Sequence, residues 1–425
     1  MIQVISNPQE EKWAQLAARP SIDSSLLERS VEEIIRAVKK GGDASLLSFT
    51  EIIDGVKLDS PLVAPEEFDG VENLIDDSLK EAIKVASGNV EKFHTAQFRE
   101  DIEVETMPGV KCFQKSLPLK RVGLYIPGGS APLFSTLLML ALPAKIAGCK
   151  EIVIATPPNK SGRIAPSILY IAKLLGITQV VKAGGAQAIA ALAYGTESIP
   201  KVDKIFGPGN QFVSEAKIQV SKIVSIDMLA GPSEVVVIAD SSANASFVAS
   251  DLLAQAEHGP DSQVFLLTDS PELAQNTLKE LESQIISLPR AQTAEKSLSN
   301  SKVIIFENIA DAVRFSNLYA PEHLIISAEN PWEIAANVEA AGSVFIGSYS
   351  PESVGDYASG TNHTLPTSGW AKSASGVSLE SFMHKITFQE LTKEGLVSIA
   401  EAVETMAAAE GLGGHRKSVS IRLNS

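Results

Sequence analysis

The residues of this chain that could do metal chemistry begin with a glutamine and a histidine at the end of a predicted helix. Gln255 and His258 lie three residues apart, so on a helix both side chains leave the same face. Gly259 and Pro260 follow directly and predict that the helix ends there. An amide oxygen and an imidazole side by side could hold a divalent metal ion, if other ligands came from elsewhere. The alternative is a polar helix end with a solvated glutamine and a capping histidine.

A second candidate is the adjacent pair Glu322 and His323, directly before the apolar run 324–326. Glutamate and histidine are the usual general acid–base side chains. Neighbouring residues of a strand point to opposite faces, so a loop conformation is needed to aim both at one site. A solvated surface pair is the alternative interpretation.

Two glycine-rich segments near the C-terminus carry further polar residues. Segment 348–367 holds Asp356 and His363, and loops of this length are usually functional or disordered. Its aromatic and apolar residues argue against disorder. His415 lies in segment 411–416, where we expect a mobile turn. Four of the six histidines thus fall in loops or at helix ends, which fits a metal or acid–base site assembled from distant segments.

The composition is that of an ordinary soluble enzyme. The chain has 425 residues, a net charge of −15, 44% hydrophobic residues and two cysteines. The acidic balance argues against nucleic acid or an anionic membrane as a partner. No apolar run reaches membrane-spanning length, and the N-terminus lacks the order of a signal peptide. Two cysteines cannot build a disulfide framework, so we expect a reducing cytoplasm.

The pattern of elements predicts an α/β protein. The first hundred residues are predicted mostly helical, over 24–40, 45–53 and 74–99, and 103–119 is predicted as a hairpin. From Arg121 on, short β-rich runs alternate with helical stretches, which is typical of parallel sheets covered by helices. In such sheets ligands bind at the carboxyl ends of the strands. The predicted strands are 122–126, 151–156, 179–182, 204–206, 234–240, 263–268, 302–306 and 343–346.

Three turns after predicted strands are rich in glycine: 125–130, 183–187 and 206–210. Glycine lets a ligand approach the backbone, and a helix N-terminus offers free N–H groups to phosphate. None matches the strict dinucleotide fingerprint, because Phe212 stands where a third glycine would follow Gly207 and Gly209. Three such turns in one region favour a phosphate-bearing ligand such as a dinucleotide. Ser233, in a turn before strand 234–240, could cap the chain or contact a ligand.

Taken in order, the segments from Arg121 to the C-terminus resemble histidinol dehydrogenases, the zinc enzymes that end histidine biosynthesis. Each short segment alone is weak, and the ordered set is specific. The segments are YIPGG, PAKIAGC, AGGAQAIAALAYGT, FGPGN, DMLAGPSE, LLAQAEHG, APEHL, GDYASGTNHTLPT and GLGGH.

The resemblance implies oxidation of L-histidinol through L-histidinal to L-histidine, with two NAD⁺ and one water. It implies that His323 is the base that takes the alcohol proton, and that Glu322 activates the water. It implies one Zn²⁺ per subunit, which orients the substrate. The implied zinc ligands are Gln255, His258, Asp356 and His415. The implied substrate contacts are these four together with Ser233, His323, His363 and Glu410, and the implied NAD contacts are Tyr125, Gln187 and Asn210.

The resemblance also implies a homodimer whose intertwined tails carry Glu410 and His415 into the partner's site. We accordingly expect two Rossmann-like parallel-sheet domains with helical N-terminal and C-terminal extensions. The expected division is an N-terminal tail 1–22, a discontinuous first domain 23–120 and 235–378 with most catalytic residues, a second domain 121–234, and a dimerisation tail 379–425.

Two other functional classes compete with this hypothesis. A zinc hydrolase acting on an amide or ester could use the same metal and Glu322 to direct an attacking water. It would have no need of the glycine-rich turns, which discriminate in favour of a dinucleotide enzyme. A ligand-binding protein without catalysis predicts that Glu322→Gln leaves every measurable property intact.

Overall fold

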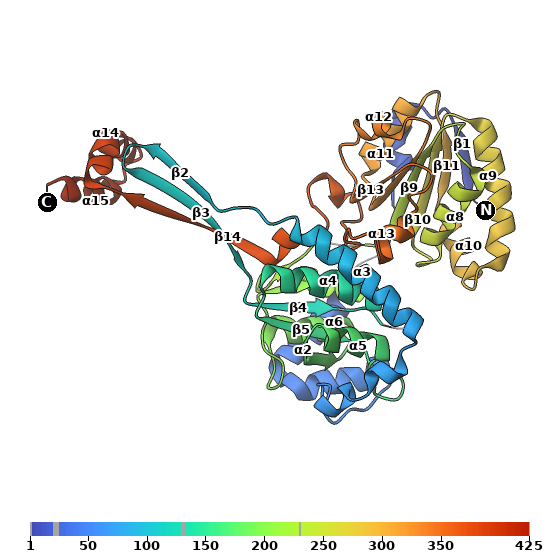
Figure 1. Ribbon diagram of the computed structural model, residues 1–425, viewed down its shortest axis with the longest axis horizontal. Coiled ribbons are helices and arrows are strands. Elements are labelled where there is room, and N and C mark those ends of the chain that lie inside the picture. The colour runs from blue at the N-terminus through green and yellow to red at the C-terminus, as the bar shows by residue number, and fades with distance from the viewer. Residues whose placement is uncertain (1, 20–24, 129–131, 229–230, 425) are drawn as a thin grey trace.

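The computed structural model describes residues 2–19, 25–128, 132–228 and 231–424. Two parallel sheets, each covered by helices, form the body of the molecule, and a third, antiparallel sheet projects from it as an arm (Figure 1). Gly129, Ser130, Leu229 and Ala230, which belong to the predicted turns, lie outside the described residues.

The larger parallel sheet has six strands, in the order β1-β11-β10-β9-β12-β13. Their bounds are β1 Gln3–Ser6, β9 Glu234–Ala239, β10 Gln263–Thr268, β11 Lys302–Ile305, β12 His323–Ser327 and β13 Ser343–Ile346. Alternate residues of these apolar strands point to opposite faces, so both faces need a cover. One face packs on α8 Ala245–Ala256, α9 Pro271–Gln284 and α10 Ala291–Ser299. The other packs on α1 Trp13–Leu16, α11 Ile309–Tyr319 and α12 Pro331–Ala335.

The smaller parallel sheet has five strands, in the order β6-β5-β4-β7-β8. Their bounds are β4 Arg121–Tyr125, β5 Glu151–Thr156, β6 Gln179–Lys182, β7 Lys204–Phe206 and β8 Ser225–Ile226. One face is covered by α3 Asp77–Thr95, α4 Phe134–Ala147 and α5 Pro166–Leu174. The other is covered by α2 Ser25–Phe49, α6 Gly185–Tyr194 and α7 Gln211–Val220.

The arm is a three-stranded antiparallel sheet with two helices at its tip (Figure 1). Its strands are β2 Ile102–Met107, β3 Val110–Pro118 and β14 Met383–Leu391, in the order β14-β3-β2. The helices are α14 Lys393–Ala409 and α15 Gly413–Leu423. Chain segments far apart in the sequence therefore meet in one sheet, with Phe388 opposite Phe113.

Short helical segments complete the secondary structure. They are η1 Glu10–Lys12, η2 Thr50–Asp54, η3 Pro65–Phe68, η4 Val71–Leu74, η5 Ile285–Ser287, α13 Glu352–Tyr357, η6 Trp370–Lys372 and η7 Leu379–Phe382. Among the described residues, no helix is both long and apolar enough to cross a membrane.

The α/β class, the two parallel sheets and the hairpin at 103–119 are confirmed. The predicted strands appear within a residue of their expected bounds. The strands β1, β8 and β14 were not predicted. Each lies at the edge of its sheet, where a strand can be short or half-exposed and so carries little apolar alternation.

The helices of 25–95 differ from the expected division of the chain. We expected residues 23–120 to belong with 235–378, but α2 packs on α6 and α7, and α3 packs on α4, all helices of the five-stranded sheet. Their apolar stripes are complementary to those helices, which the helical periodicity alone cannot reveal. Of the N-terminal part, it is β1 and α1 that join the six-stranded sheet.

Candidate functional site

The polar residues gather at the amino edge of the six-stranded sheet, where its strands begin. Glu234 and His323 are the first residues of β9 and β12. Helix α8 follows β9 and runs back across the sheet, so its end brings His258 to the same edge. We expected ligands at the carboxyl ends of the strands, whereas the candidate residues of this sheet lie at the amino ends. The functional candidates lie where helices return to the sheet, before the next strand.

Glu322 and His323 both face this edge although they are adjacent in sequence. Ala320 adopts a left-handed conformation, with φ of 53°, and turns the chain before β12, so Glu322 lies outside the strand. The Glu322 carboxylate accepts a 2.9 Å hydrogen bond from the backbone N–H of Glu234. His323 Nδ1 donates to the Glu234 carbonyl oxygen at 3.2 Å, because a carbonyl can only accept. Both side chains are buried, with exposures of 6% and 4%.

This tautomer makes Nε2 of His323 the basic nitrogen. Nε2 is buried without a hydrogen-bond partner among the described residues and lies 3.7 Å from the nearer carboxylate oxygen of Asp356. Burial lowers the pKa of His323 to about 3. The imidazole is therefore neutral at physiological pH, as a general base must be before it takes a proton.

His258 and two carboxylates beside it form a group that could hold a metal ion. Ligand atoms of His258, Glu352 and Asp356 all lie within 4.8 Å of one another. Glu352 and Asp356 share a face of α13, one helical turn apart. We did not select Glu352 from the sequence, because we interpreted 348–367 as a loop. A helical interpretation of that segment would have placed its carboxylate beside that of Asp356.

The Gln255 side chain reaches the same group from α8. It is fully buried, and with its amide nitrogen toward Glu352 it donates to both carboxylate oxygens, at 3.0 Å to Oε2. This orientation keeps the amide oxygen of Gln255 available as a ligand. The donor set of one imidazole, one amide oxygen and carboxylate oxygens is suited to zinc.

The carboxylates are crowded into a buried space. Burial, and after it the charge of Asp356, raises the pKa of Glu352 well above its usual range. Burial also raises the pKa of Glu322, and it raises that of Asp356 to about 6. Each of the three has a carboxylate oxygen 3.6 or 3.7 Å from a nitrogen of His323, but that imidazole is neutral and does not balance their charge. A bound divalent cation would let these groups stay ionised.

His363 joins this edge to the five-stranded sheet. Its Nδ1 donates to the backbone oxygen of Asp356 at 2.8 Å, and its Nε2 accepts from Thr136 Oγ1 at 3.1 Å. Beside it, the Asn362 amide donates to the Met139 carbonyl at 2.6 Å. Thr136 and Met139 belong to α4, which follows β4. The amino edge of the larger sheet therefore faces the carboxyl edge of the smaller one.

The three predicted NAD contacts lie at this carboxyl edge. Tyr125 ends β4, and its hydroxyl accepts from the Gly185 N–H at 3.1 Å, at the start of α6. Both amide atoms of the fully buried Gln187 have no partner among the described residues. Asn210 caps α7 by accepting from two backbone N–H groups, those of Phe212 and Val213.

The turn at 206–210 depends on the absence of a side chain. Gly207 has φ of 122°, and a Cβ there would overlap the Tyr125 carbonyl oxygen. Two helix N-termini and an unsatisfied buried amide at one edge can receive a dinucleotide.

Two predicted site residues lie elsewhere. Glu410 directly follows α14 and His415 lies in α15, and both residues are exposed. These two helices lie at the tip of the arm, away from the parallel sheets that carry the other candidates (Figure 1). We expected His415 in a mobile turn, and that is wrong, because it belongs to α15. Gly413 and Gly414 start this helix rather than prevent it.

The comparisons with known proteins agree with this architecture. A family model described as histidinol dehydrogenase matches residues 17–423. The chain belongs to the histidinol dehydrogenase family. It is 54% identical to a histidinol dehydrogenase of Bacteroides thetaiotaomicron over 426 residues, with all of both chains covered. It is 52% identical to that of Escherichia coli K12, over 98% of this chain and 96% of that one. A crystal structure of histidinol dehydrogenase from Elizabethkingia anophelis matches with 49% identity and a TM-score of 0.97, covering 100% of this chain and 98% of that chain.

The buried carboxylates predict how stability responds to metal removal. The pKa of Asp356 is raised from 3.8 to about 6, so the metal-free folded state binds a proton that the unfolded chain has released. Stability of the chelated protein should therefore fall as pH rises from about 4 through about 6, and the raised pKa values of Glu322 and Glu352 act in the same direction. Zinc-loaded protein should show the opposite trend, because protons compete with the metal. Urea unfolding across this pH range measures both.

The matched control is Asp356→Asn, which removes the titrating group. In chelated protein this variant should lose part of the decline in stability with pH. If the decline were equally steep in the wild type and in this variant, the carboxylate of Asp356 would not be the group that titrates.

Proposed function

We propose that this chain oxidises L-histidinol through L-histidinal to L-histidine, with two NAD⁺ and one water, at the site between its two parallel sheets. As a member of its family, it is an NAD-dependent oxidoreductase of histidine biosynthesis. The observation that carries the proposal is the neutral, buried His323 beside a cation-binding group, at an edge that faces glycine-rich helix N-termini.

The metal in this proposal is zinc, one per chain, held by Gln255, His258 and Asp356 and by His415 of a second copy. Glu352, which accepts from the Gln255 amide, would fix that amide and balance the charge. When bound, zinc would hold the imidazole and amino nitrogens of the substrate and so orient its alcohol carbon. Ser233 and His363 of the same chain, with Glu410 of the second copy, would complete the substrate contacts.

His323 is the base of the first oxidation. Its Nε2 has no partner among the described residues and takes the hydroxyl proton as the hydride leaves the same carbon for the nicotinamide. The Glu234 carbonyl holds Nδ1–H, which keeps the tautomer fixed and stabilises the imidazolium that forms.

Glu322 acts in the second oxidation. Before it, His323 releases its first proton to solvent and a second NAD⁺ replaces the NADH. The Glu322 carboxylate takes a proton from the water that adds to the aldehyde carbon, and His323 then takes the hydroxyl proton of the resulting hydrate as the second hydride leaves for the second NAD⁺. Burial raises the pKa of Glu322, which makes its ionised form a stronger base than an exposed carboxylate.

A homodimer accounts for the two residues at the tip of the arm. The arm exposes large apolar side chains that no described segment covers: Ile102, Val104, Met107, Leu117, Ile386, Phe388, Leu391, Val397, Met406, Leu412 and Ile421. An apolar surface of this extent is typical of a protein interface. A second copy lying along the arm would cover it and receive Glu410 and His415.

A zinc hydrolase would use the same metal group and Glu322. The buried Gln187 amide, which has no partner among the described residues, and the helix starts at the facing edge have no task in hydrolysis. They favour the dehydrogenase.

Substitution separates the acid–base group from the metal group. Glu322→Gln should keep its zinc and lose about 100-fold or more of histidinol-dependent NADH formation, because one general-base contribution is removed. His258→Asn should lose zinc and activity together. Absorbance of NADH and metal analysis of the same samples measure both. Normal turnover in Glu322→Gln would contradict the role of Glu322 as a general base. A full zinc content in His258→Asn would contradict the role of His258 as a metal ligand.

Shared sites predict complementation between two inactive variants. A heterodimer of Glu322→Gln and His415→Asn contains one site with Glu322 from one chain and His415 from the other. Mixed and refolded, or co-expressed with two tags and purified as heterodimer, it should recover up to half of the wild-type activity. A verified heterodimer without activity would contradict sharing, and a fully active His415→Asn homodimer would exclude that ligand.

A further inference from the structure

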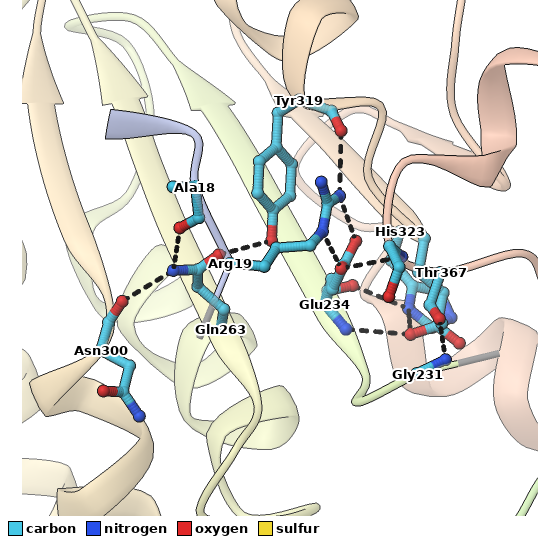
Figure 2. A network of polar contacts seen from close by, with 11 residues as sticks. Ala18, Arg19, Gly231, Glu234, Gln263, Asn300, Tyr319, His323 and Thr367 are labelled. Atoms are coloured by element: carbon cyan, nitrogen blue, oxygen red, sulfur yellow. Dashed lines mark hydrogen bonds and ion pairs between the residues drawn. The ribbon is translucent and has the colours of Figure 1, made fainter. Parts of the chain in front are cut away.

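An arginine from the N-terminal segment pairs with Glu234, the residue whose backbone contacts both Glu322 and His323. Arg19 Nε pairs with one oxygen of the Glu234 carboxylate, and its Nη2 donates to the other at 2.9 Å. The same Nη2 donates to the Tyr319 carbonyl at 2.9 Å, and the guanidinium lies 4.0 Å from the centre of the Tyr319 ring (Figure 2). This two-pronged contact fixes both the position and the plane of the carboxylate.

Glu234 is held on several sides. It is buried, with 2% exposure, and its carboxylate also accepts from the Ser368 N–H at 3.0 Å. A buried carboxylate of this kind is stable only while its donors stay in place, since an unpaired charge in such surroundings is costly. The side chain therefore anchors the first residue of β9.

The backbone of Glu234 holds both members of the catalytic pair. Its N–H donates to the Glu322 carboxylate at 2.9 Å, and its carbonyl accepts from His323 Nδ1 at 3.2 Å. One residue thus fixes the carboxylate and the imidazole, while its side chain is fixed by Arg19. Figure 2 shows the chain of contacts from Arg19 through Glu234 to His323.

We propose that Arg19 is a positioning residue for the reaction, and that it acts on Glu322 and His323 through Glu234. The inference rests on the roles proposed for Glu322 and His323. Among the described residues, the hydrogen bonds and the ion pair of Arg19 go to Glu234 and Tyr319, and none goes directly to the metal group or to a predicted substrate contact. Its loss should therefore disturb proton transfer more than binding. A small shift of a general base, on the order of an ångström, is enough to slow the step it catalyses.

The alternative is that Arg19 merely fastens the N-terminal segment to the body. The chain offers a matched control for this. Arg314 pairs with Glu10 of the same segment and lies 5.1 Å from the Trp13 ring. Its contacts with the segment are made by η1 and α1, and its other ion pair is with Asp311 on its own helix, away from β9. Arg314→Met loosens the segment without touching Glu234.

The experiment compares Arg19→Met, Arg19→Lys, Glu234→Gln and Arg314→Met as full-length, zinc-loaded protein. For Arg19→Met we expect kcat for histidinol to fall about 10- to 100-fold, with KM for histidinol and NAD⁺ unchanged within about twofold and zinc content unchanged. A loss confined to kcat is the sign of an effect on the reacting geometry. Arg19→Lys should keep part of kcat, because lysine keeps the positive charge but cannot donate to both oxygens of the Glu234 carboxylate as the planar guanidinium does. Arg314→Met should keep the wild-type kcat.

A double variant tests whether Arg19 acts through Glu234. Arg19→Met combined with Glu234→Gln should be no slower than the slower single variant, because both remove the same interaction. If the kcat losses of the two single variants multiplied in the double variant, Arg19 would not act through Glu234. Three results would each overturn the positioning role of Arg19. They are a wild-type kcat in Arg19→Met, equal kcat losses in Arg19→Met and Arg314→Met, and a change in KM without a change in kcat.

Glu322→Gln, assayed in parallel, separates the positioning role from the proposed function. If Glu322→Gln is inactive and Arg19→Met is fully active, the positioning role fails and the proposed function stands. If Glu322→Gln is fully active, the proposed function is contradicted, and the positioning role that rests on it is contradicted as well. Should Arg19→Met prove insoluble, Arg19→Lys and Glu234→Gln carry the test with the same readouts and the same criteria.

Discussion

The site depends on one constraint: three carboxylates share a buried space around a single imidazole. Glu322, Glu352 and Asp356 each approach a nitrogen of His323 to 3.6 or 3.7 Å. Burial raises the pKa of each carboxyl, and the neighbouring carboxylates add to this for Glu322 and Glu352. A bound cation would stabilise such a cluster and would lie beside the imidazole that we propose as the base. Burial of the same imidazole lowers the pKa of His323, so the group that must accept a proton stays neutral.

The arrangement of the two parallel sheets places this cluster opposite the glycine-rich turns. In each sheet the helices run against the strands, so one edge carries the ends of helices and the other carries their beginnings. The larger sheet presents the edge where α8 ends, with the carboxylates and imidazoles. The smaller presents the starts of α6 and α7, with the buried Gln187 amide that has no partner among the described residues. The contact of His363 with Thr136 and that of Asn362 with Met139 hold these unlike edges together. The proposed proton acceptor and the glycine-rich turns proposed to bind NAD therefore face each other.

Much of this could be predicted from the sequence, because it depends on local patterns. The alternation of apolar runs predicts most strands of both sheets, and the glycine-rich turns predict the starts of α6 and α7. The site residues came chiefly from the ordered resemblance to a family, since the spacing of Gln255 and His258 alone allows a simple helix cap. Glu352 was missed because a short helix inside a Gly/Ser-rich segment leaves no periodic signal.

Arg19 and Glu234 were missed for another reason. They are far apart in the sequence, and only the fold joins them. The edge at which Glu322 and His323 lie likewise follows from the packing of whole helices, not from any local pattern.

The central claim is that a metal enters the carboxylate cluster and that the neighbouring imidazole then serves two successive oxidations. Metal content and histidinol-dependent NADH formation, measured on one preparation, test it most directly. The account predicts about one zinc per chain and about two NADH formed for each histidinol consumed, with both lost on chelation and both restored by zinc. Full NADH formation in protein stripped of metal, or zinc-loaded protein that forms no NADH from histidinol, would contradict it.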